Sequence, residues 1–326
     1  MSTGRKLSYS LAINEALKQL MEIDKSVFIL GQGVKSPWYV GNTCRDLIEL
    51  YGEDRVIDTP ISENAMTGAA VGASIAGMKA IIIHPRLDFA LYAFDPIINQ
   101  AANWSYMSGG RSSAPVVFWM VINRGGEQAA QHSQALHSIF AHIPGLKVVA
   151  PSNAYDAKGL FIAAVNDKNP VVFIDDRWLY NRECIVPEEM YEIPIGKGKI
   201  IKEGNDMTVV SSSFLVSESE KCLSILSSEG IDIELIDLRT LKPFDEDLII
   251  KSVKKTGKLI IVDGSWKTNS ISAEIAASVY EKLFGYLKAP IQRVNLPDTP
   301  APASRSLESV YYITAETIIN AIKKIV

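Results

Sequence analysis

The stretch Asp58–Gly77 reads DTPISENAMTGAAVGASIAG and decides the fold more than any other part of the chain. It continues the strand-like run RVID, whose last residue is Asp58, and turns at Pro60. Ser62 then stands where an N-cap residue is expected, ahead of a helix that begins with Glu63. An acid in the first turn is favoured by the helix dipole, by about 0.3–1 kcal/mol. The stretch therefore predicts a strand, a tight turn and a helix.

The predicted helix after Ser62 contains an unusual number of small residues. Gly68, Gly72 and Gly77 are interspersed with alanines, although a glycine inside a helix costs roughly 1 kcal/mol relative to alanine. Such a composition makes sense where another backbone approaches closely, either within the subunit or at an interface between subunits. The sequence leaves both explanations open.

Strand-like and helical patterns alternate along the chain, which is typical of parallel α/β sheets. Several runs, among them IIIH and VVFWMV, are apolar at consecutive positions, as in strands covered on both faces. Strands are expected at residues 27–31, 80–84, 116–121, 146–150, 171–174, 207–211, 233–238, 258–262 and 291–294. Helices are expected at residues 11–23, 43–51, 63–76, 89–106, 155–165, 218–227, 272–284 and 315–325.

The length of 326 residues suggests two domains of this α/β class. Residues 181–203 carry prolines, glycines and charges with little helical periodicity, and a second alternating block follows them. We expect an N-terminal domain over residues 1–180, a connector over 181–203 and a C-terminal domain over 204–326.

Composition narrows the class of partner. A net charge of −4, from 33 basic and 37 acidic residues, gives no electrostatic footprint for nucleic acid. We find no run of about 18 apolar residues that would span a membrane, and the first twenty residues lack the apolar core of a secretory signal. Cys44, Cys184 and Cys222 form no CxxC pair, so we expect neither a zinc site nor a disulfide framework. We therefore expect a cytoplasmic protein with no nucleic-acid or membrane partner.

Several common motifs are missing or incomplete. Gly31-Gln32-Gly33 follows a strand but lacks the third glycine of a dinucleotide-binding loop. The chain has neither a P-loop nor a GxSxG nucleophile elbow. Its four histidines do not have a metal-ligand spacing. His132 is a candidate for catalysis, although a lone histidine beside polar neighbours is more often structural.

Taken in order, the motifs resemble the beta subunits of the pyruvate, branched-chain 2-oxo-acid and acetoin dehydrogenase complexes. DTPISE and the small-residue helix open the match. QHSQ (131–134), AHIPGLKVVAPSNAYDAKGL (141–160) and APIQRVNLPDTPAP (289–302) continue it. The resemblance covers essentially the whole chain.

This resemblance implies a thiamine-diphosphate pyrimidine-binding domain over residues 1–180 and a transketolase-type C-terminal domain over 204–326. It also implies a function: the beta subunit of a heteromeric 2-oxo-acid dehydrogenase, which decarboxylates a 2-oxo acid and passes the acyl group to a lipoyl acceptor. An alpha subunit with a GDG…N motif would bind Mg²⁺ and the diphosphate, and no GDG occurs in this sequence. The expected partners are that alpha subunit, a second beta subunit in an α₂β₂ heterotetramer, and a lipoyl acyltransferase core.

The resemblance also assigns roles to individual residues. Glu63 would hydrogen-bond the pyrimidine ring and so activate the cofactor, and Phe89 would stack on that ring. His132 would steady the reacting group or move a proton during acyl transfer. Ile61 and Tyr92 complete the expected cofactor-binding set.

A structural potassium ion, held mainly by backbone carbonyls, is also expected from the resemblance. The matching positions are Val116, Ala164, Asp167 and Asn169.

The chain departs from the family pattern at several positions. Gln32 stands where an acid is usual, Trp119 replaces an arginine, and Asp175 and Gly264 each replace a glutamate. Several of these positions are expected to lie along the substrate channel. Either drift or an altered substrate explains them, and in the second case pyruvate would not be the preferred substrate.

Two other interpretations remain. One is a split transketolase or carboligase subunit of the same superfamily, although such chains usually lack DTPISE and have THQ in place of HSQ. The other is a non-catalytic subunit that only assembles with a partner, although such a subunit would not need Glu63, Phe89 and His132.

Overall fold

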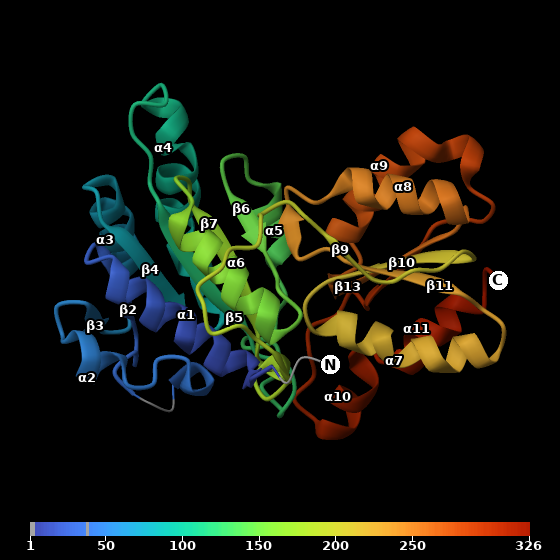
Figure 1. The fold of residues 1–326 in the computed structure, drawn as a ribbon, viewed down its shortest axis with the longest axis horizontal. Coiled ribbons are helices and arrows are strands. Elements are labelled where there is room, and N and C mark those ends of the chain that lie inside the picture. Colours follow the sequence, from blue (N-terminus) through green and yellow to red (C-terminus); the bar gives the residue numbers. More distant parts are fainter. Residues whose placement is uncertain (1–3, 37–38) are drawn as a thin grey trace.

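The computed structural model describes residues 4–36 and 39–326, which form two halves lying side by side (Figure 1). The N-terminal half is built on a seven-stranded sheet with the order β12-β6-β7-β5-β4-β2-β3. Its strands are β2 (Val27–Gly31), β3 (Val56–Asp58), β4 (Lys79–His84), β5 (Val116–Ile122), β6 (Lys147–Val149), β7 (Val171–Asp176) and β12 (Thr240–Lys242). Neighbouring strands pair in parallel except β12, which runs antiparallel to β6.

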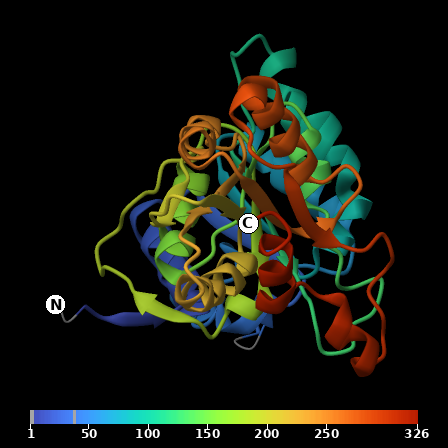
Figure 2. The same ribbon diagram turned by 90° about the vertical axis from the view of Figure 1, so that its right-hand side faces the viewer.

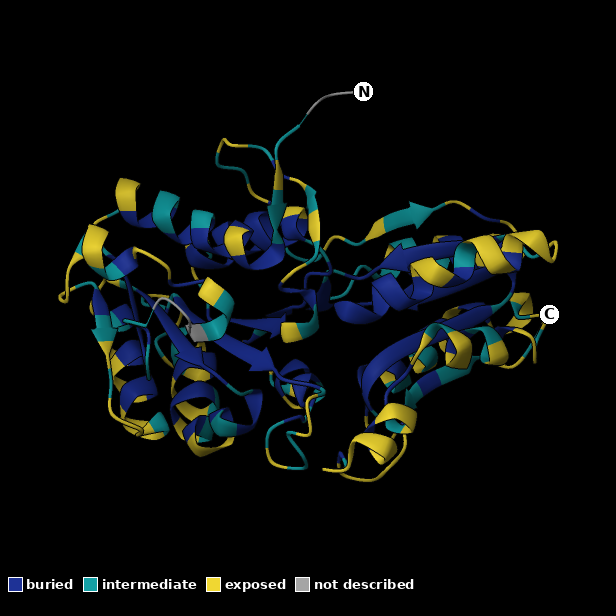
Figure 3. Ribbon diagram, turned by 90° about the horizontal axis from the view of Figure 1, so that it is seen from below, coloured by how far each residue is buried: buried dark blue, intermediate teal, exposed yellow. Residues whose placement is uncertain are grey.

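Helices cover both faces of this sheet, which is why its central strands are apolar at consecutive positions. α1 (Tyr9–Ile23) and α6 (Ala154–Asn166) pack on one face. The other face carries α3 (Glu63–Ile75), the 3-10 helix η2 (Leu87–Ala93) and α5 (His137–His142). Figure 3 shows the resulting core, with most strand residues buried and the outer helix faces exposed.

The C-terminal half follows the same plan, on a five-stranded sheet with the order β14-β13-β10-β11-β9. Its strands are β9 (Lys199–Lys202), β10 (Met207–Ser211), β11 (Ile233–Asp237), β13 (Leu259–Trp266) and β14 (Gln292–Leu296). Its helices are α7 (Phe214–Ser228), α8 (Glu246–Thr256), α9 (Ile271–Leu283) and α11 (Ala315–Ile322). α8 and α9 cover one face and α7 and α11 the other, as Figures 1 and 2 show.

The two halves are linked by shared strands as well as by the connecting segment. β12 comes from the C-terminal part of the chain but completes the N-terminal sheet by pairing with β6. Within residues 181–203, β8 (Glu183–Ile185) pairs with β1 (Lys6–Ser8), and β9 joins the C-terminal sheet. We propose that the domain boundaries lie near residues 180 and 204, with β12 contributed by the second domain to the first.

Two helices differ from the sequence-based expectation. The single helix expected over residues 89–106 is a succession of η2, the π-helix η3 (Asp95–Ala101) and α4 (Ala102–Met107). Pro96, at the start of η3, has no N–H group and cannot continue the hydrogen bonds of the preceding turns. The helix expected over residues 43–51 is shorter, because only α2 (Leu47–Tyr51) is α-helical there.

The remaining elements are short. They are η1 (Tyr39–Asn42), η4 (Arg177–Leu179), η5 (Phe284–Tyr286) and α10 (Arg305–Tyr311). In residues 4–36 and 39–326, no helix has both the length and the apolar composition needed to cross a membrane.

Candidate active site

Parallel strands deliver the candidate residues to one edge of the N-terminal sheet. Glu63 follows β3, Phe89 follows β4 and His132 follows β5, so all three lie beyond the carboxyl ends of parallel strands, with β2 between β3 and β4. The chain goes from β2 to β3 on one side and then returns to β4 on the other side of β2. A crevice at such a reversal of strand order is where α/β sheets bind ligands.

Glu63 is the first residue of α3 and is half-buried. The turn that precedes it is tied to the loop after β2, because the Asp58 carboxylate accepts a hydrogen bond of 2.6 Å from the Gly33 backbone N–H. Ser62 stands at the N-cap position, but its side chain makes no capping hydrogen bond. The capping role expected for Ser62 is therefore wrong, and the helix start is fixed by the turn around it.

Phe89 and His132 are in direct contact. Their rings meet edge to face with centroids 5.5 Å apart, and both residues are half-buried. By contrast, Ile61 is 70% exposed and Tyr92 is 77% exposed. The structure thus pairs two of the predicted residues and leaves the other two apolar side chains on the surface.

Asp88 is a site residue that the sequence-based reasoning missed. It precedes Phe89 and is buried, and its carboxylate accepts hydrogen bonds from the Gln134 side chain at 2.7 Å and the Gln134 backbone at 3.3 Å. Burial raises the pKa of the Asp88 carboxyl, and these hydrogen bonds together with the nearby His132 partly oppose that rise. The available signal was an acid directly beside the predicted stacking aromatic.

Trp119 does not line a channel. Its side chain is fully buried on the face of the sheet covered by α6, where it packs edge to face against Phe161. Its indole N–H donates to the Asp175 carboxylate at 3.1 Å, and the Tyr180 hydroxyl donates to the same oxygen at 2.9 Å. The expectation that Trp119 reshapes the substrate pocket is wrong, because this side chain belongs to the hydrophobic core.

Gly264 is explained by an arginine that the sequence-based reasoning did not single out. Arg124, after β5, is buried and forms a 2.7 Å ion pair with Asp176 at the end of β7. A Cβ atom on residue 264 would lie 2.8 Å from the Arg124 guanidinium. A glutamate could not occupy position 264 without displacing Arg124, so Gly264 and Arg124 form a matched pair.

The four positions predicted for potassium lie at the opposite edge of the sheet. Val116 begins β5, Ala164 is in the last turn of α6, and Asp167 and Asn169 precede β7. The Asp167 carboxylate is already engaged by the Lys147 ammonium and by the Asn169 backbone N–H. The last carbonyls of a helix have no partner within it and lie at the negative end of its dipole, so the donor type suits a cation. In the described part of the chain, no group of three or more His, Cys, Asp or Glu side chains could hold a metal ion.

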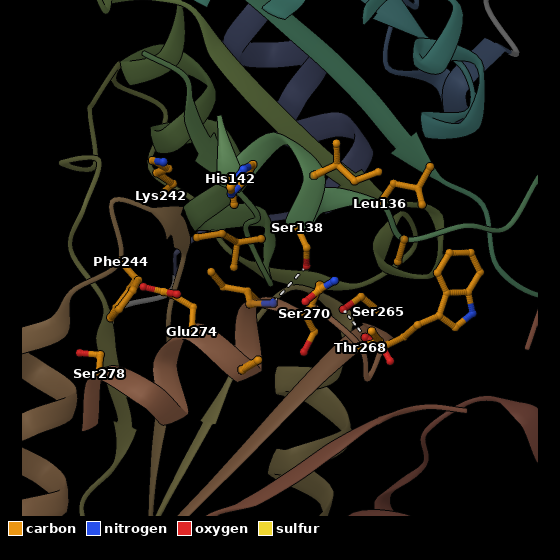
Figure 4. Close-up of a pocket in the computed structure, with 18 of the residues that line it drawn as sticks. Leu136, Ser138, His142, Lys242, Phe244, Ser265, Thr268, Ser270, Glu274 and Ser278 are labelled. Atoms are coloured by element: carbon orange, nitrogen blue, oxygen red, sulfur yellow. Dashed lines mark hydrogen bonds between the residues drawn. The ribbon is translucent and has the colours of Figure 1, made fainter. Parts of the chain in front are cut away.

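A large groove lies elsewhere, between α5 and the C-terminal half (Figure 4). It has a volume of about 1130 Å³, and Ser138, His142, Phe244, Trp266 and Glu274 are among the residues that line it. Glu63, Phe89 and His132 do not line this groove. The candidate site at the edge of the sheet is therefore separate from this groove.

One face of α3 has exposed small residues, including Gly68, Ala69 and Gly72, and the C-cap residue Ala76 is also exposed. A Cβ atom on Gly68 or Gly72 would meet no described atom within 4 Å. Close packing inside this chain therefore does not account for these glycines. Of the two explanations that the sequence leaves open, an interface between subunits remains as a hypothesis.

Two family models together match nearly the whole chain. The model of the transketolase pyrimidine-binding domain matches residues 5–183, and that of the transketolase C-terminal domain matches residues 196–318.

Curated relatives match over almost their full length. The beta subunit of acetoin:2,6-dichlorophenolindophenol oxidoreductase from Cupriavidus necator is 43% identical and covers 98% of each chain. The subunit of the same name from Bacillus subtilis is 41% identical, over 97% of this chain and 96% of the relative. The beta subunit of the pyruvate dehydrogenase E1 component from Rickettsia felis is 41% identical over 96% of each chain.

Among solved structures, a split-gene transketolase described as an inactive beta4 tetramer superimposes with a TM-score of 0.80. It is 20% identical, and 98% of each chain is covered. At this identity the likeness concerns the fold alone.

Proposed function

Because this chain belongs to the transketolase-like family that includes the beta subunits of the pyruvate dehydrogenase E1 component and of acetoin oxidoreductase, we propose that it is the beta subunit of a thiamine-diphosphate-dependent 2-oxo-acid dehydrogenase. The observation that carries the proposal is the placement of Glu63, Phe89 and His132 after β3, β4 and β5, parallel strands whose carboxyl ends share one edge of the sheet, with β2 between β3 and β4. The Phe89–His132 contact supports a shared role at that edge of the sheet.

The residues of this edge suit the pyrimidine half of thiamine diphosphate. A flat aromatic ring needs an apolar surface and one strong hydrogen-bond acceptor, and Phe89 and Glu63 offer these. Ile61 and Tyr92 add exposed apolar surface. When bound, the cofactor supplies the carbon nucleophile and the electron sink for breaking a bond next to a carbonyl group. Glu63 then hydrogen-bonds the pyrimidine ring, and Phe89 holds its face.

His132 is the group placed to move a proton. It is half-buried and touches Phe89, so it lies beside the proposed pyrimidine site and is still accessible from solvent. In the net reaction the bond to the carboxylate breaks and CO₂ leaves. The acyl carbon joins one sulfur of the lipoyl disulfide, the S–S bond breaks, and the other sulfur takes up a proton. Delivery of that proton, or stabilisation of the charge that precedes it, is the role we assign to His132.

The open geometry supports a site shared with a partner. Ile61 and Tyr92 stay exposed, and a Cβ atom added at Gly68 or Gly72 of α3 would meet no described atom beyond its own helix within 4 Å. Exposed small and apolar side chains at a cofactor site are what a partner subunit would cover. We assign the missing half to an alpha subunit that carries Mg²⁺ and the diphosphate on a GDG…N motif, in an α₂β₂ assembly. Potassium at residues 116, 164, 167 and 169 is proposed on the carbonyl chemistry of that edge.

The substrate is best identified by assay of the assembled complex. Relatives of similar identity are named for pyruvate dehydrogenase and for acetoin oxidation. Pyruvate, branched 2-oxo acids and acetoin should therefore be compared, with an artificial electron acceptor and with lipoamide. We expect 2-oxo-acid-dependent release of CO₂ that requires both subunits. Activity with sugar phosphates alone would favour the split-transketolase alternative, and the lack of any turnover would favour a non-catalytic subunit.

A further inference from the structure

The loop between β5 and α5, residues 123–136, has a backbone that needs external support. Glu127 has φ of 62° and Ala129 has φ of 60°, in the left-handed region that side chains disfavour. Gly125 and Gly126 also have positive φ. Since His132 lies in this loop, whatever holds these residues also sets the position of His132.

One support comes from the C-terminal half. Glu308 on α10 is buried at 7% exposure, and its carboxylate accepts a hydrogen bond of 3.1 Å from the Glu127 backbone N–H. The Tyr312 hydroxyl accepts one of 3.4 Å from the Gly125 N–H. A Cβ atom on Gly125 would lie 2.8 Å from Trp178, so the loop rests directly on that indole. Both acceptors thus fix the loop just where its φ values are positive.

The second support comes from the segment that carries Phe89. Asp88 accepts from Gln134, two residues after His132, through both the backbone and the side chain. His132 therefore lies between two anchored points, Glu127 and Gln134. Each anchor is a buried carboxylate from an element outside the loop.

We propose that Glu308 is a positioning residue, which holds the His132 loop in its working conformation from the C-terminal half of the chain. This inference rests on the proposed role of His132. A backbone N–H that loses a buried carboxylate acceptor is left unpaired, and the positive-φ turn loses the contact that compensates for it. The loop should then relax, and His132 should move away from the reacting group while Phe89 and Glu63 stay in place.

The test uses the complex co-purified with its alpha subunit, with the best substrate of the panel and free lipoamide as the acyl acceptor. Glu308→Ala should lower kcat for acyl transfer at least tenfold and shift its pH profile, with KM and thiamine-diphosphate affinity within twofold of wild type. Glu308→Gln keeps an oxygen acceptor and should stay within threefold of wild type. Glu316→Ala, at an exposed position on α11, is the matched control and should change nothing.

Two further variants separate the outcomes. If His132→Ala leaves acyl transfer intact, the proposed function of His132 fails. If His132→Ala impairs transfer but Glu308→Ala does not, the positioning role is overturned. Should Glu308→Ala fail to fold, Glu308→Asp keeps the charge but draws the carboxylate back from the Glu127 N–H. That variant should lower kcat several-fold at unchanged KM, and wild-type kcat in it would equally contradict the proposal.

Discussion

At Trp119 and Asp175 the resemblance leads one to expect an arginine and a glutamate, and the structure shows that Trp119 and Asp175 touch. The indole N–H of Trp119 donates to the Asp175 carboxylate inside the core. Arg124 and Gly264 are likewise in contact, at the junction of the two halves. These contacts place the four side chains among buried polar partners, and Trp119 itself does not line a pocket.

Glu63 is the residue on which the proposed chemistry depends most. Glu63→Gln keeps the size and the helix start but removes the charge that would act on the pyrimidine ring. We expect a folded complex whose decarboxylation rate falls by orders of magnitude. Steady-state assay together with circular dichroism checks this. A rate within twofold of wild type, equivalent to about 0.4 kcal/mol in the barrier, would remove Glu63 from the mechanism.

Asp175 should make stability depend on pH. Burial raises the pKa of its carboxyl from 3.8 to about 7, although hydrogen bonds from Tyr180 and Trp119 oppose the rise. The folded state thus keeps a proton that the unfolded chain releases, so the stabilisation is complete below about pH 4 and is lost as pH rises through about 7. Asp237, with a pKa also raised to about 7 by burial, acts in the same direction.

Asp175→Asn should remove one proton from this dependence, because the amide stays neutral and still accepts both hydrogen bonds. We expect urea unfolding of the variant to lose less stability between pH 4 and 7, with a slope smaller by up to about 1.4 kcal/mol per pH unit. Asp54→Asn, at an exposed position, is the control. Identical slopes for wild type and Asp175→Asn would show that Asp175 is ionised throughout this range.

At the scale of elements, α3 combines a candidate site residue at its start with a proposed interface along its small-residue face. Its glycines meet no described atom of this chain, so a larger side chain should be harmless until a partner arrives. Gly72→Leu should leave the isolated chain as stable as wild type, or more stable by up to about 1 kcal/mol from helix propensity. The same change should block assembly with the alpha subunit or with a second beta subunit.

Light scattering after size exclusion, with and without the co-expressed alpha subunit, checks this prediction. Gly72→Ala is the conservative comparison and should assemble more readily than Gly72→Leu. Ser224→Leu places the same bulk on an exposed position of α7 and should not affect assembly. Normal assembly of Gly72→Leu would mean that the small-residue face of α3 is not an interface.

Helices and strands with a clear pattern of apolar residues could be predicted from the sequence. Elements whose position depends on contacts with distant parts of the chain could not. The apolar runs of β4 and β5 and the helical pattern of α6 lie in the sequence itself, so their positions agree with expectation within one or two residues. β12 is three residues long and exists because β6 offers it an open edge, which no local pattern reveals. α8 was not predicted, although the sequence contains both of its end signals. Asp245 caps its start, and Gly257 ends it with a φ of 77°.

The residues of the candidate site also fall into a group that could be predicted from the sequence and a group that could not. Glu63, Phe89 and His132 belong to motifs that stand out along the sequence, and the structure brings Phe89 and His132 into contact. Asp88 and Arg124 were missed because their importance comes from burial beside residues far away in the chain. Trp119 was misjudged because a sequence position does not reveal which face of a strand is covered by α6.

At the scale of the whole molecule, buried polar pairs fasten the two halves together. His137 at the start of α5 bonds Asp263 of β13 at 2.8 Å. Arg239, beside β12, forms a bidentate pair with Asp156, which is fully buried on α6. Because these pairs join elements of different halves, the chain should unfold as a coupled unit.

Arg239→Ala should weaken that coupling strongly. It leaves the Asp156 carboxylate buried without its cation, and breaking such a pair typically costs 3–5 kcal/mol. We expect the free energy of unfolding in urea to fall by about that amount. Lys18→Ala, which removes an exposed ion pair with Asp46, should leave the free energy of unfolding close to that of wild type and serves as the control. A loss below about 1 kcal/mol for Arg239→Ala would show that the Asp156 pair does not hold the halves together.

The central claim is that this chain supplies only the pyrimidine half of a cofactor site. Isothermal titration with thiamine diphosphate and Mg²⁺ tests it most directly, first on the isolated chain and then on the complex with the alpha subunit. We predict weak or no saturable binding to the isolated chain and tight binding to the complex, which Glu63→Gln weakens. Micromolar binding of the cofactor by the isolated chain would contradict the claim.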